Sequence, residues 1–257
     1  MRLDDIVADP ELHRCFIRQL AHWYEKTFFC QDDFSLVQRG ALEKKLTMLL
    51  EMWAERYPSQ NPEDVLWARA VLLEGSRPYD APGSSLLPSA VYDLFAQRTS
   101  HRKWKNMPVS LAVVDQLLDI GISSPSSANR QAVRFVVIRE SSDEKSYLAD
   151  LIKHDFVRRA PLIFLIGVDT RLYAAHENDR VVEDAAVCAQ TMVLYGESMG
   201  LGSCYITAHE IDLAEPKIRY GIPATTKMLI SLPFGYRDTV FCKPPRLPRG
   251  DHILREF

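Results

Sequence analysis

A basic segment rich in hydroxyl groups is the first part of the chain that could do chemistry. Residues 97–105, QRTSHRKWK, carry four formal positive charges and no acid. Guanidinium groups form charge-assisted paired hydrogen bonds with phosphate oxygens, and serine or threonine hydroxyls can satisfy the remaining acceptors. The segment therefore has the composition of a phosphate-monoester site. A solvated basic helix end has the same composition, so this segment alone leaves both interpretations open.

Two later segments also carry groups that could bind a ligand. Residues 123–131, SSPSSANRQ, place hydroxyl and amide groups before a predicted strand, where open sheets tend to bind ligands. A plain helix-to-strand turn explains the serines and the proline, but it explains Asn129 and Gln131 less well. Residues 200–206, GLGSCYI, follow a long predicted helix. Their glycines permit positive φ and close approach of a flat ligand, although a helix C-cap alone would also use them.

The elements that must position these segments alternate along the second part of the chain. Periodicity predicts helices over residues 90–97, 111–120, 143–153 and 181–199. Apolar runs predict strands over residues 134–139, 162–168, 203–207 and 227–232. The mixture favours an α+β or α/β fold.

The first part of the chain has a different pattern. Residues 1–75 read as helices, with starts at Asp9-Pro10-Glu11 and Asn61-Pro62-Glu63 and an end at Gly75. Leucines from Leu36 onward form one helical stripe that continues to about Tyr57. Residues 76–89 are rich in proline, serine and glycine and predict a linker. We therefore divide the chain into an N-terminal helical extension with its linker, 1–89, and a second domain, 90–257.

Composition excludes several classes of protein. The 257 residues are 47% hydrophobic with a formal net charge of −3, so no global positive field draws the chain to nucleic acid or anionic lipid. The apolar run 160–168 is too short to cross a membrane, and the acidic N-terminus does not resemble a signal peptide. The five cysteines contain no CxxC pair and the histidines are scattered. We expect a cytoplasmic protein without a protein-ligated metal.

Taken in order, the three segments resemble the FMN-dependent nitroreductase family. The resemblance covers about residues 90–257 and includes two further motifs, the helix segment Asp184-Ala185-Ala186 and the turn Gly235-Tyr236-Arg237, followed by a basic C-terminus. Five motifs in register are far more specific than any one of them. The resemblance implies an α+β nitroreductase-like fold, with a central, mostly antiparallel sheet flanked by helices. It also implies an interlocked homodimer with FMN at the interface.

The resemblance also assigns roles to residues. The FMN phosphate would be held by Arg98, Ser100, Arg102 and a C-terminal base, Arg246. The ribityl chain and the pyrimidine edge would be lined by Pro125, Ser126, Ser127 and Asn129, with help from Gln131. The isoalloxazine ring would lie against Gly200, Leu201 and Gly202. Family members are dimers of this kind, so Arg98 and Ser126 would serve one flavin from different chains.

Three positions depart from the family pattern. The chain has Ala132-Val133 where many members have Pro-Trp, and Arg237 where the family often has proline. An additional proline changes the spacing of the C-terminal basic pair, which makes Lys243 a less secure phosphate ligand than Arg246. The helical extension has no counterpart in the minimal fold. It either covers the flavin pocket and sets substrate choice, or only enlarges the dimer interface.

The function implied by the resemblance is ping-pong hydride transfer. NADH or NADPH would reduce the flavin, and a nitro, quinone, enone or halogenated aromatic compound would reoxidise it, or a biosynthetic intermediate would be oxidised. The cofactor carries this chemistry, so no side chain is assigned as a catalytic residue. The alternative of a flavin-binding protein without turnover stays open.

A different alternative is an α/β-hydrolase. Residues 196–200, GESMG, match the nucleophile-elbow pattern with Ser198 as nucleophile, and Asp212 and His252 follow in the required order. The apolar residues from Ala185 to Met199 keep a helical spacing through the supposed strand and elbow, which disfavours this reading.

Overall fold

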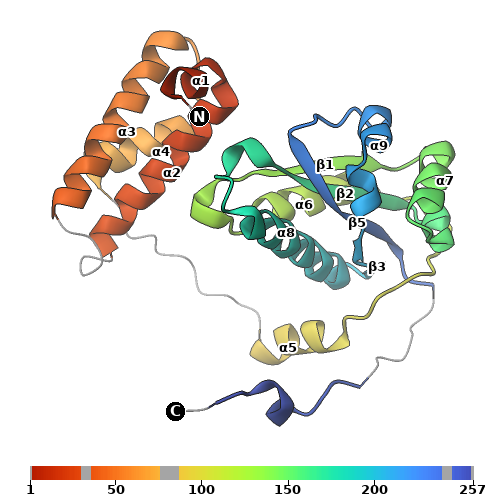
Figure 1. Ribbon diagram of the computed structural model, residues 1–257. Coiled ribbons are helices and arrows are strands. Elements are labelled where there is room, and N and C mark those ends of the chain that lie inside the picture. Colours follow the sequence, from red (N-terminus) through yellow and green to blue (C-terminus); the bar gives the residue numbers. More distant parts are fainter. Residues whose placement is uncertain (1, 30–35, 76–86, 239–244, 256–257) are drawn as a thin grey trace.

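Helices α1 to α4 form a bundle at the N-terminal end of the chain. The computed structural model describes residues 2–29, 36–75, 87–238 and 245–255. The four helices are α1 (Leu3–Ala8), α2 (Pro10–Phe29), α3 (Leu36–Arg56) and α4 (Glu63–Glu74). They surround a core of their own, which is centred on the fully buried Trp53 and lies beside the sheet domain (Figure 1).

In this bundle, the predicted helix starts at Pro10 and Glu63 and the predicted helix end at Gly75 are confirmed. Local hydrogen bonds and backbone conformation explain two of them. The Asp9 carboxylate accepts the backbone N–H of Glu11 at 2.9 Å and that of Leu12 at 3.2 Å, which satisfies donors at the start of α2. Gly75 ends α4 with φ of +70°, a conformation that glycine adopts at little cost.

A five-stranded sheet forms the centre of the second part of the chain. Its strands are β1 (Val133–Ile138), β2 (Leu162–Asp169), β5 (Thr226–Tyr236) and β3 (Leu201–Ser203), in that order, with β4 (Ile206–Thr207) also paired to β5. Every ladder is antiparallel. The predicted α+β class is therefore confirmed.

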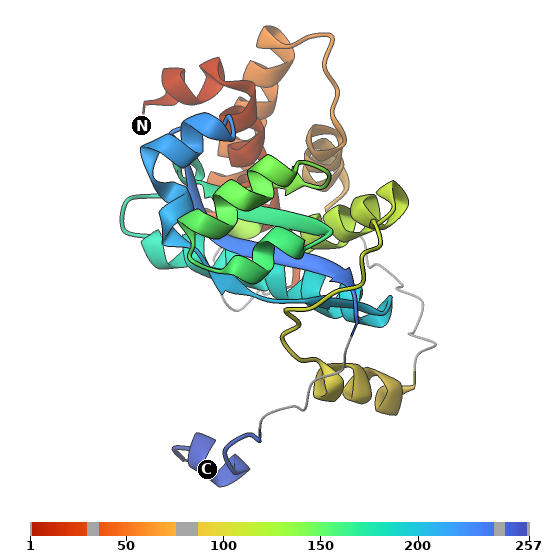
Figure 2. The same cartoon turned by 90° about the vertical axis from the view of Figure 1, so that its right-hand side faces the viewer.

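Helices cover both faces of this sheet. Successive side chains along each strand point to opposite faces, so alternate residues pack against different helices. Phe164 and Ile166 of β2 pack in the cluster with α6 (Leu111–Ile122) and α8 (Asn178–Ser198). Ile163 and Leu165 point to the other face, which is covered by α7 (Ser142–Leu151), α9 (Ala214–Arg219) and the short helices η3 (Asp155–Arg159) and η5 (His209–Asp212). Figure 2 shows the two layers on either side of the sheet. All of β2 is buried, which explains its continuous apolar sequence.

Two strand predictions differ from the structure by more than one residue in their bounds. The strand predicted over 203–207 is divided into β3 and β4, because Cys204 and Tyr205 leave the ladder between them. The strand predicted to end at residue 232 continues to Tyr236. Pro233 lacks an N–H, but its carbonyl accepts the Cys204 N–H at 3.3 Å, so the strand passes through it.

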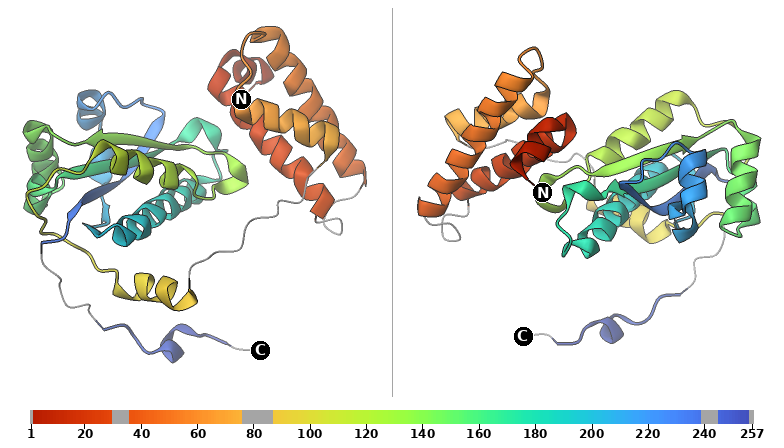
Figure 3. Two further views of the ribbon diagram at one scale, coloured as in Figure 1. Left: turned by 180° about the vertical axis from the view of Figure 1, so that it is seen from behind. Right: turned by 45° about the horizontal axis from the view of Figure 1, so that its top comes forward.

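Two segments extend away from the packed body. Helix α5 (Pro88–Gln97) buries none of its residues, and residues 245–255, which include η6 (Arg249–His252), are exposed throughout (Figures 1 and 3). The predicted linker residues 76–86, together with Cys30, Cys242 and Lys243, lie outside the described residues. Within the described ranges, no helix is both long and apolar enough to span a membrane.

Candidate functional site

The basic segment runs alongside strand β3. Arg98 is the C-cap of α5, and Ser100 forms a parallel bridge with Ser203. The His101 N–H donates to the Ser203 carbonyl at 2.8 Å, and the indole N–H of Trp104 donates to the Gly202 carbonyl at 2.8 Å. These bonds fix the segment against the sheet, so its polar side chains occupy defined positions.

Arg98 and Arg102 place positive charge beside the end of β3. Burial raises the pKa of the Cys204 thiol, whereas the charges of Arg102 and Arg98 and a side-chain hydrogen bond with Arg102 lower it. Neither arginine forms an ion pair with a carboxylate of the described residues, whereas Lys103 pairs with Asp238 at 2.9 Å. Two guanidinium groups without a carboxylate partner among the described residues, on either side of Ser100 in the sequence, fit the donor set that a phosphate monoester requires.

The loop of residues 125–131, which includes η2 (Ser127–Asn129), has an unusual backbone. Ala128, Asn129 and Gln131 have φ values of +50°, +53° and +55°, although none is glycine. Such residues persist only where surrounding contacts hold them, and they often lie at ligand sites. The Ser126 hydroxyl accepts the Gln131 N–H at 3.0 Å, and the Gln131 amide donates to the Asn129 Oδ1 at 3.1 Å. The structure therefore brings Ser126, Asn129 and Gln131 together, and Pro125 is exposed beside them.

Contacts from the core hold the 125–131 loop. The Ser127 N–H donates to the Asp184 carboxylate of α8 at 2.9 Å. The buried Arg130 guanidinium donates to the Ser127 carbonyl and hydroxyl at 3.1 Å, and it pairs with Glu177 at 2.9 Å. The sequence motifs include Arg130 and Asp184 but do not indicate that these residues hold the loop. Glu177, which also holds it, belongs to none of the motifs. A buried arginine in a polar loop requires an acidic partner, but the sequence does not indicate which acid.

The two glycines of the segment after α8 are required for different physical reasons. Gly200 has φ of +77° and open space where a Cβ would lie. Gly202 is buried in β3, and a Cβ there would lie 2.5 Å from the His101 Cγ. Leu201 is also buried. Close packing thus accounts for Gly202, while backbone conformation accounts for Gly200.

The departure from the family pattern at Arg237 has a clear role. Its guanidinium pairs with the buried Glu197 at 2.7 Å and donates to the Gly200 carbonyl at 3.3 Å. Arg237 therefore fixes the turn between α8 and β3 from the end of β5.

The two groups of predicted flavin ligands lie at opposite ends of α8 (Figure 1). The 125–131 loop is bonded to Asp184 near the start of the helix, whereas the basic segment and Gly200 lie beyond its last residue, Ser198. Fourteen residues separate Asp184 from Ser198, which is about 21 Å at the α-helical rise per residue. Arg246 lies in the exposed 245–255 segment, and among the described contacts none joins it to either group.

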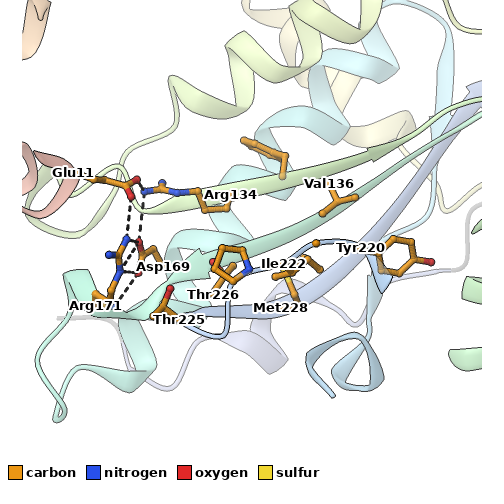
Figure 4. Close-up of a pocket in the computed structure, with 13 residues that line it drawn as sticks. Glu11, Arg134, Val136, Asp169, Arg171, Tyr220, Ile222, Thr225, Thr226 and Met228 are labelled. Carbon is orange, nitrogen blue, oxygen red and sulfur yellow. Dashed lines mark hydrogen bonds and ion pairs between the residues drawn. The ribbon is translucent and has the colours of Figure 1, made fainter. Parts of the chain in front are cut away.

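Two cavities among the described residues are lined by residues other than the predicted flavin ligands, although the second includes Arg130 of the 125–131 loop. One of about 610 Å³ has an apolar end formed by Val136, Ile222 and Met228 (Figure 4). At its polar end, Arg171 pairs with Asp169 at 2.6 Å and with Glu11 at 3.0 Å, and Glu11 also pairs with Arg134. A second hollow of about 840 Å³ lies between α1–α3 and residues 171–177. A single chain does not enclose the predicted flavin ligands in either cavity.

Comparison with known families decides the classification. A model of the nitroreductase family matches residues 95–154 and 145–236, more than half of the chain. The chain belongs to the nitroreductase family. The resemblance recognised in the sequence is therefore confirmed.

This nitroreductase-family chain is similar to named proteins over its second part. It is 27% identical over 178 residues to an NADPH-dependent oxidoreductase of Staphylococcus epidermidis, which covers 62% of this chain and 70% of the relative. It also superposes, with a TM-score of 0.59 and 26% identity, on a Desulfovibrio desulfuricans structure described as a nitroreductase in complex with FMN. That match covers 67% of this chain and 98% of the other. An NADPH:FMN oxidoreductase of Vibrio harveyi shares the fold, with a TM-score of 0.57 and 22% identity over 65% of this chain and 77% of that one.

The hydrolase alternative is wrong for this nitroreductase-family chain. A nucleophile elbow requires a strand before the serine and a helix after it. Here Ser198 is the last residue of α8, and its hydroxyl donates to the Tyr195 carbonyl at 2.6 Å. Asp212 instead accepts the Met228 N–H and pairs with Lys217, so it is not available to orient a histidine.

Proposed function

We propose that this protein is an FMN-dependent oxidoreductase that takes reducing equivalents from NADH or NADPH and passes them to a small organic acceptor. The observation that carries the proposal is the pair Arg98 and Arg102, which lack a carboxylate partner among the described residues and flank Ser100 in the sequence. The Staphylococcus and Vibrio relatives are named as NADPH-dependent or flavin oxidoreductases, and the Desulfovibrio structure contains FMN, which supports the same assignment.

Different residues of this chain would bind different parts of FMN, according to the chemistry of each side chain. Arg98, Ser100 and Arg102, with Arg246, would bind the phosphate through charge-assisted bonds. Ser126, Ser127, Asn129 and Gln131, beside Pro125, would bind the ribityl hydroxyls and the polar edge of the ring, because they offer both donors and acceptors. Gly200, with Leu201 and Gly202 behind it, would leave space for the flat ring.

Bound FMN would supply hydride acceptance and donation, which no side chain of this protein can provide. The chain would orient the flavin ring, exclude water, and bind the electron donor and the electron acceptor in turn at the same place. Two substrates that use one place in turn give ping-pong kinetics. We therefore assign no side chain as general acid or base.

We further propose that two chains form each flavin site. In one chain, about 21 Å of helix lies between Asp184, which is bonded to the loop, and Ser198, beyond which the basic segment lies. A C2 dimer would bring the loop of one protomer to the basic segment of its partner. Helix α5 supports this proposal, because Tyr92 and Phe95 are exposed by 73% and 53% on a helix without buried residues. Exposed Val182 and Val187 on α8 extend the same apolar character.

The test of the proposed function is anaerobic reduction of the reconstituted protein. We expect apo-protein to bind FMN and the flavin absorbance to bleach when NADH or NADPH is added, then to return with a nitroaromatic, quinone, enone or halogenated phenol. Steady-state rates against both substrates should give parallel double-reciprocal lines. Tight FMN binding without reduction by either nucleotide would support the flavin-binding alternative, and no FMN binding would overturn the proposal.

A further inference from the structure

The N-terminal helices contact the 125–131 loop at its most constrained point. Arg130 lies between Asn129 and Gln131, both of which have left-handed backbone angles. The Arg130 carbonyl accepts a hydrogen bond from the Arg18 Nη2 at 3.0 Å and faces the Cys15 Sγ at 3.8 Å. Both donors come from α2, so the helical extension holds the loop through its backbone.

Arg18 is itself held in one position. Its Nη1 pairs with the Asp64 carboxylate of α4 at 2.6 Å, and the two side chains are only 8% and 14% exposed. Arg14 binds the other oxygen of the same carboxylate at 2.9 Å. A buried guanidinium has few alternative partners, so the Arg18 fork is fixed between α4 and the loop.

The loop is consequently fixed from two directions while its polar side chains remain available. Asp184 and Glu177 hold it from the sheet domain, through Ser127 and the Arg130 guanidinium. Arg18 holds the opposite side, at the Arg130 carbonyl. The Ser126 hydroxyl accepts the Gln131 backbone N–H, and the Gln131 side chain donates to Asn129, so these bonds stay within the loop.

We propose that Arg18 is a positioning residue for FMN, which keeps the 125–131 loop in its binding conformation before the cofactor arrives. The inference rests on the proposed function and assigns to the extension a specific task in it. Each left-handed residue carries a conformational cost that persists only where surrounding contacts compensate for it. A loop that is already held loses less entropy on binding, which tightens affinity without any contact between Arg18 and the ligand.

The experiment compares one substitution at two arginines that share the same acid. In Arg18→Lys the charge beside Asp64 remains, but one ammonium replaces the two nitrogens that reach Asp64 and the Arg130 carbonyl separately. Arg14→Lys makes the same change where no loop atom is contacted. We expect FMN to bind Arg18→Lys about 10-fold more weakly than wild type, as for loss of one charge-assisted bond, and Arg14→Lys within about 2-fold.

Hydrogen exchange of the full-length apo-protein supplies a second readout. The amides of residues 126–131 should exchange faster in Arg18→Lys than in Arg14→Lys or wild type. Folding is checked by thermal melts, which should agree for the two variants. Equal FMN affinity and equal loop exchange in both variants would overturn the inference. Wild-type protein that binds no FMN would overturn the proposed function instead, so the two failures are distinguishable.

Discussion

Arg98 is the side chain that most directly tests the phosphate assignment. It forms no ion pair with an acid of the described residues, so its charge is free to compensate a phosphate. Arg98→Met should weaken FMN binding about 10- to 100-fold, the range expected for a lost charged hydrogen bond, and leave riboflavin binding unchanged because riboflavin has no phosphate. Flavin fluorescence titrations measure both. Lys105→Met is the control, since Lys105 is exposed in the same basic run. Equal losses for FMN and riboflavin would contradict the assignment.

Gly202 and Gly40 form a second comparison at the scale of single residues. A Cβ on Gly202 would meet the buried His101 ring at 2.5 Å, so Gly202→Ala should lower the free energy of unfolding by about 1–3 kcal/mol. Gly40 lies inside helix α3, with nothing within 4 Å of a Cβ. Gly40→Ala should therefore raise the free energy of unfolding by about 0.5–1 kcal/mol. Urea denaturation of the apo-protein measures both, and a destabilised Gly40→Ala would show that the helix needs this glycine.

Helix α2 connects the helical extension to the sheet domain. Its Leu12 and Cys15 belong to the core formed with α6 and α8, while Ile17 and Tyr24 belong to the core of the N-terminal bundle. Deletion of the extension would therefore expose part of the sheet domain's own core. Point substitutions such as Arg18→Lys test the role of the helical extension better than deletion does, because they leave both cores intact.

His13 makes the stability of this element depend on pH. Burial lowers the pKa of His13; the bond from its Nε2 to the Leu49 carbonyl opposes that change, and Arg56 reinforces it. Below about pH 6.5 the unfolded chain takes up a proton that the folded chain does not. The free energy of unfolding should then fall with decreasing pH, by at most about 1.4 kcal/mol per unit for this group.

The measurement is urea denaturation between pH 7 and pH 5. His13→Gln should have a smaller pH dependence than wild type, although the lowered pKa values of His22 and His101 leave part of it. His209→Gln is the matched control, because it makes the same substitution at an exposed histidine. A wild-type slope in His13→Gln would show that His13 titrates alike in the folded and unfolded chains.

The sequence predicts the elements well and their mutual contacts poorly, for a physical reason. Period and capping residues identify α2, β2 and α8, because these signals are local. The bond from Arg18 to the Arg130 carbonyl joins residues 112 positions apart, and no local pattern marks it. The same holds for Arg130 and Glu177. The predicted ligand groups were identified from motifs, but their separation along α8 required the structure.

At the scale of the whole molecule, the proposal that two chains form each flavin site predicts the behaviour of a mixed dimer. A dimer with Arg98→Met in one chain and Asn129→Ala in the other contains one damaged site and one intact site if the ligands of each flavin come from different protomers. If both ligand groups belonged to one chain, neither site in that dimer would be intact. The mixed dimer therefore distinguishes the two arrangements directly.

Co-production of the two variants with different affinity tags, and purification through both tags, isolates this mixed dimer. We expect it to bind about half of the FMN of the wild-type dimer, because C2 symmetry gives two equivalent sites and one is restored. Each variant alone should bind little FMN at the same concentration, since both of its sites are damaged. Absorbance of bound flavin per protein measures the ratio. A mixed dimer that binds no more FMN than its parents would place both ligand groups in a single chain. The 125–131 loop or the basic segment would then have to move along α8 to reach the other group.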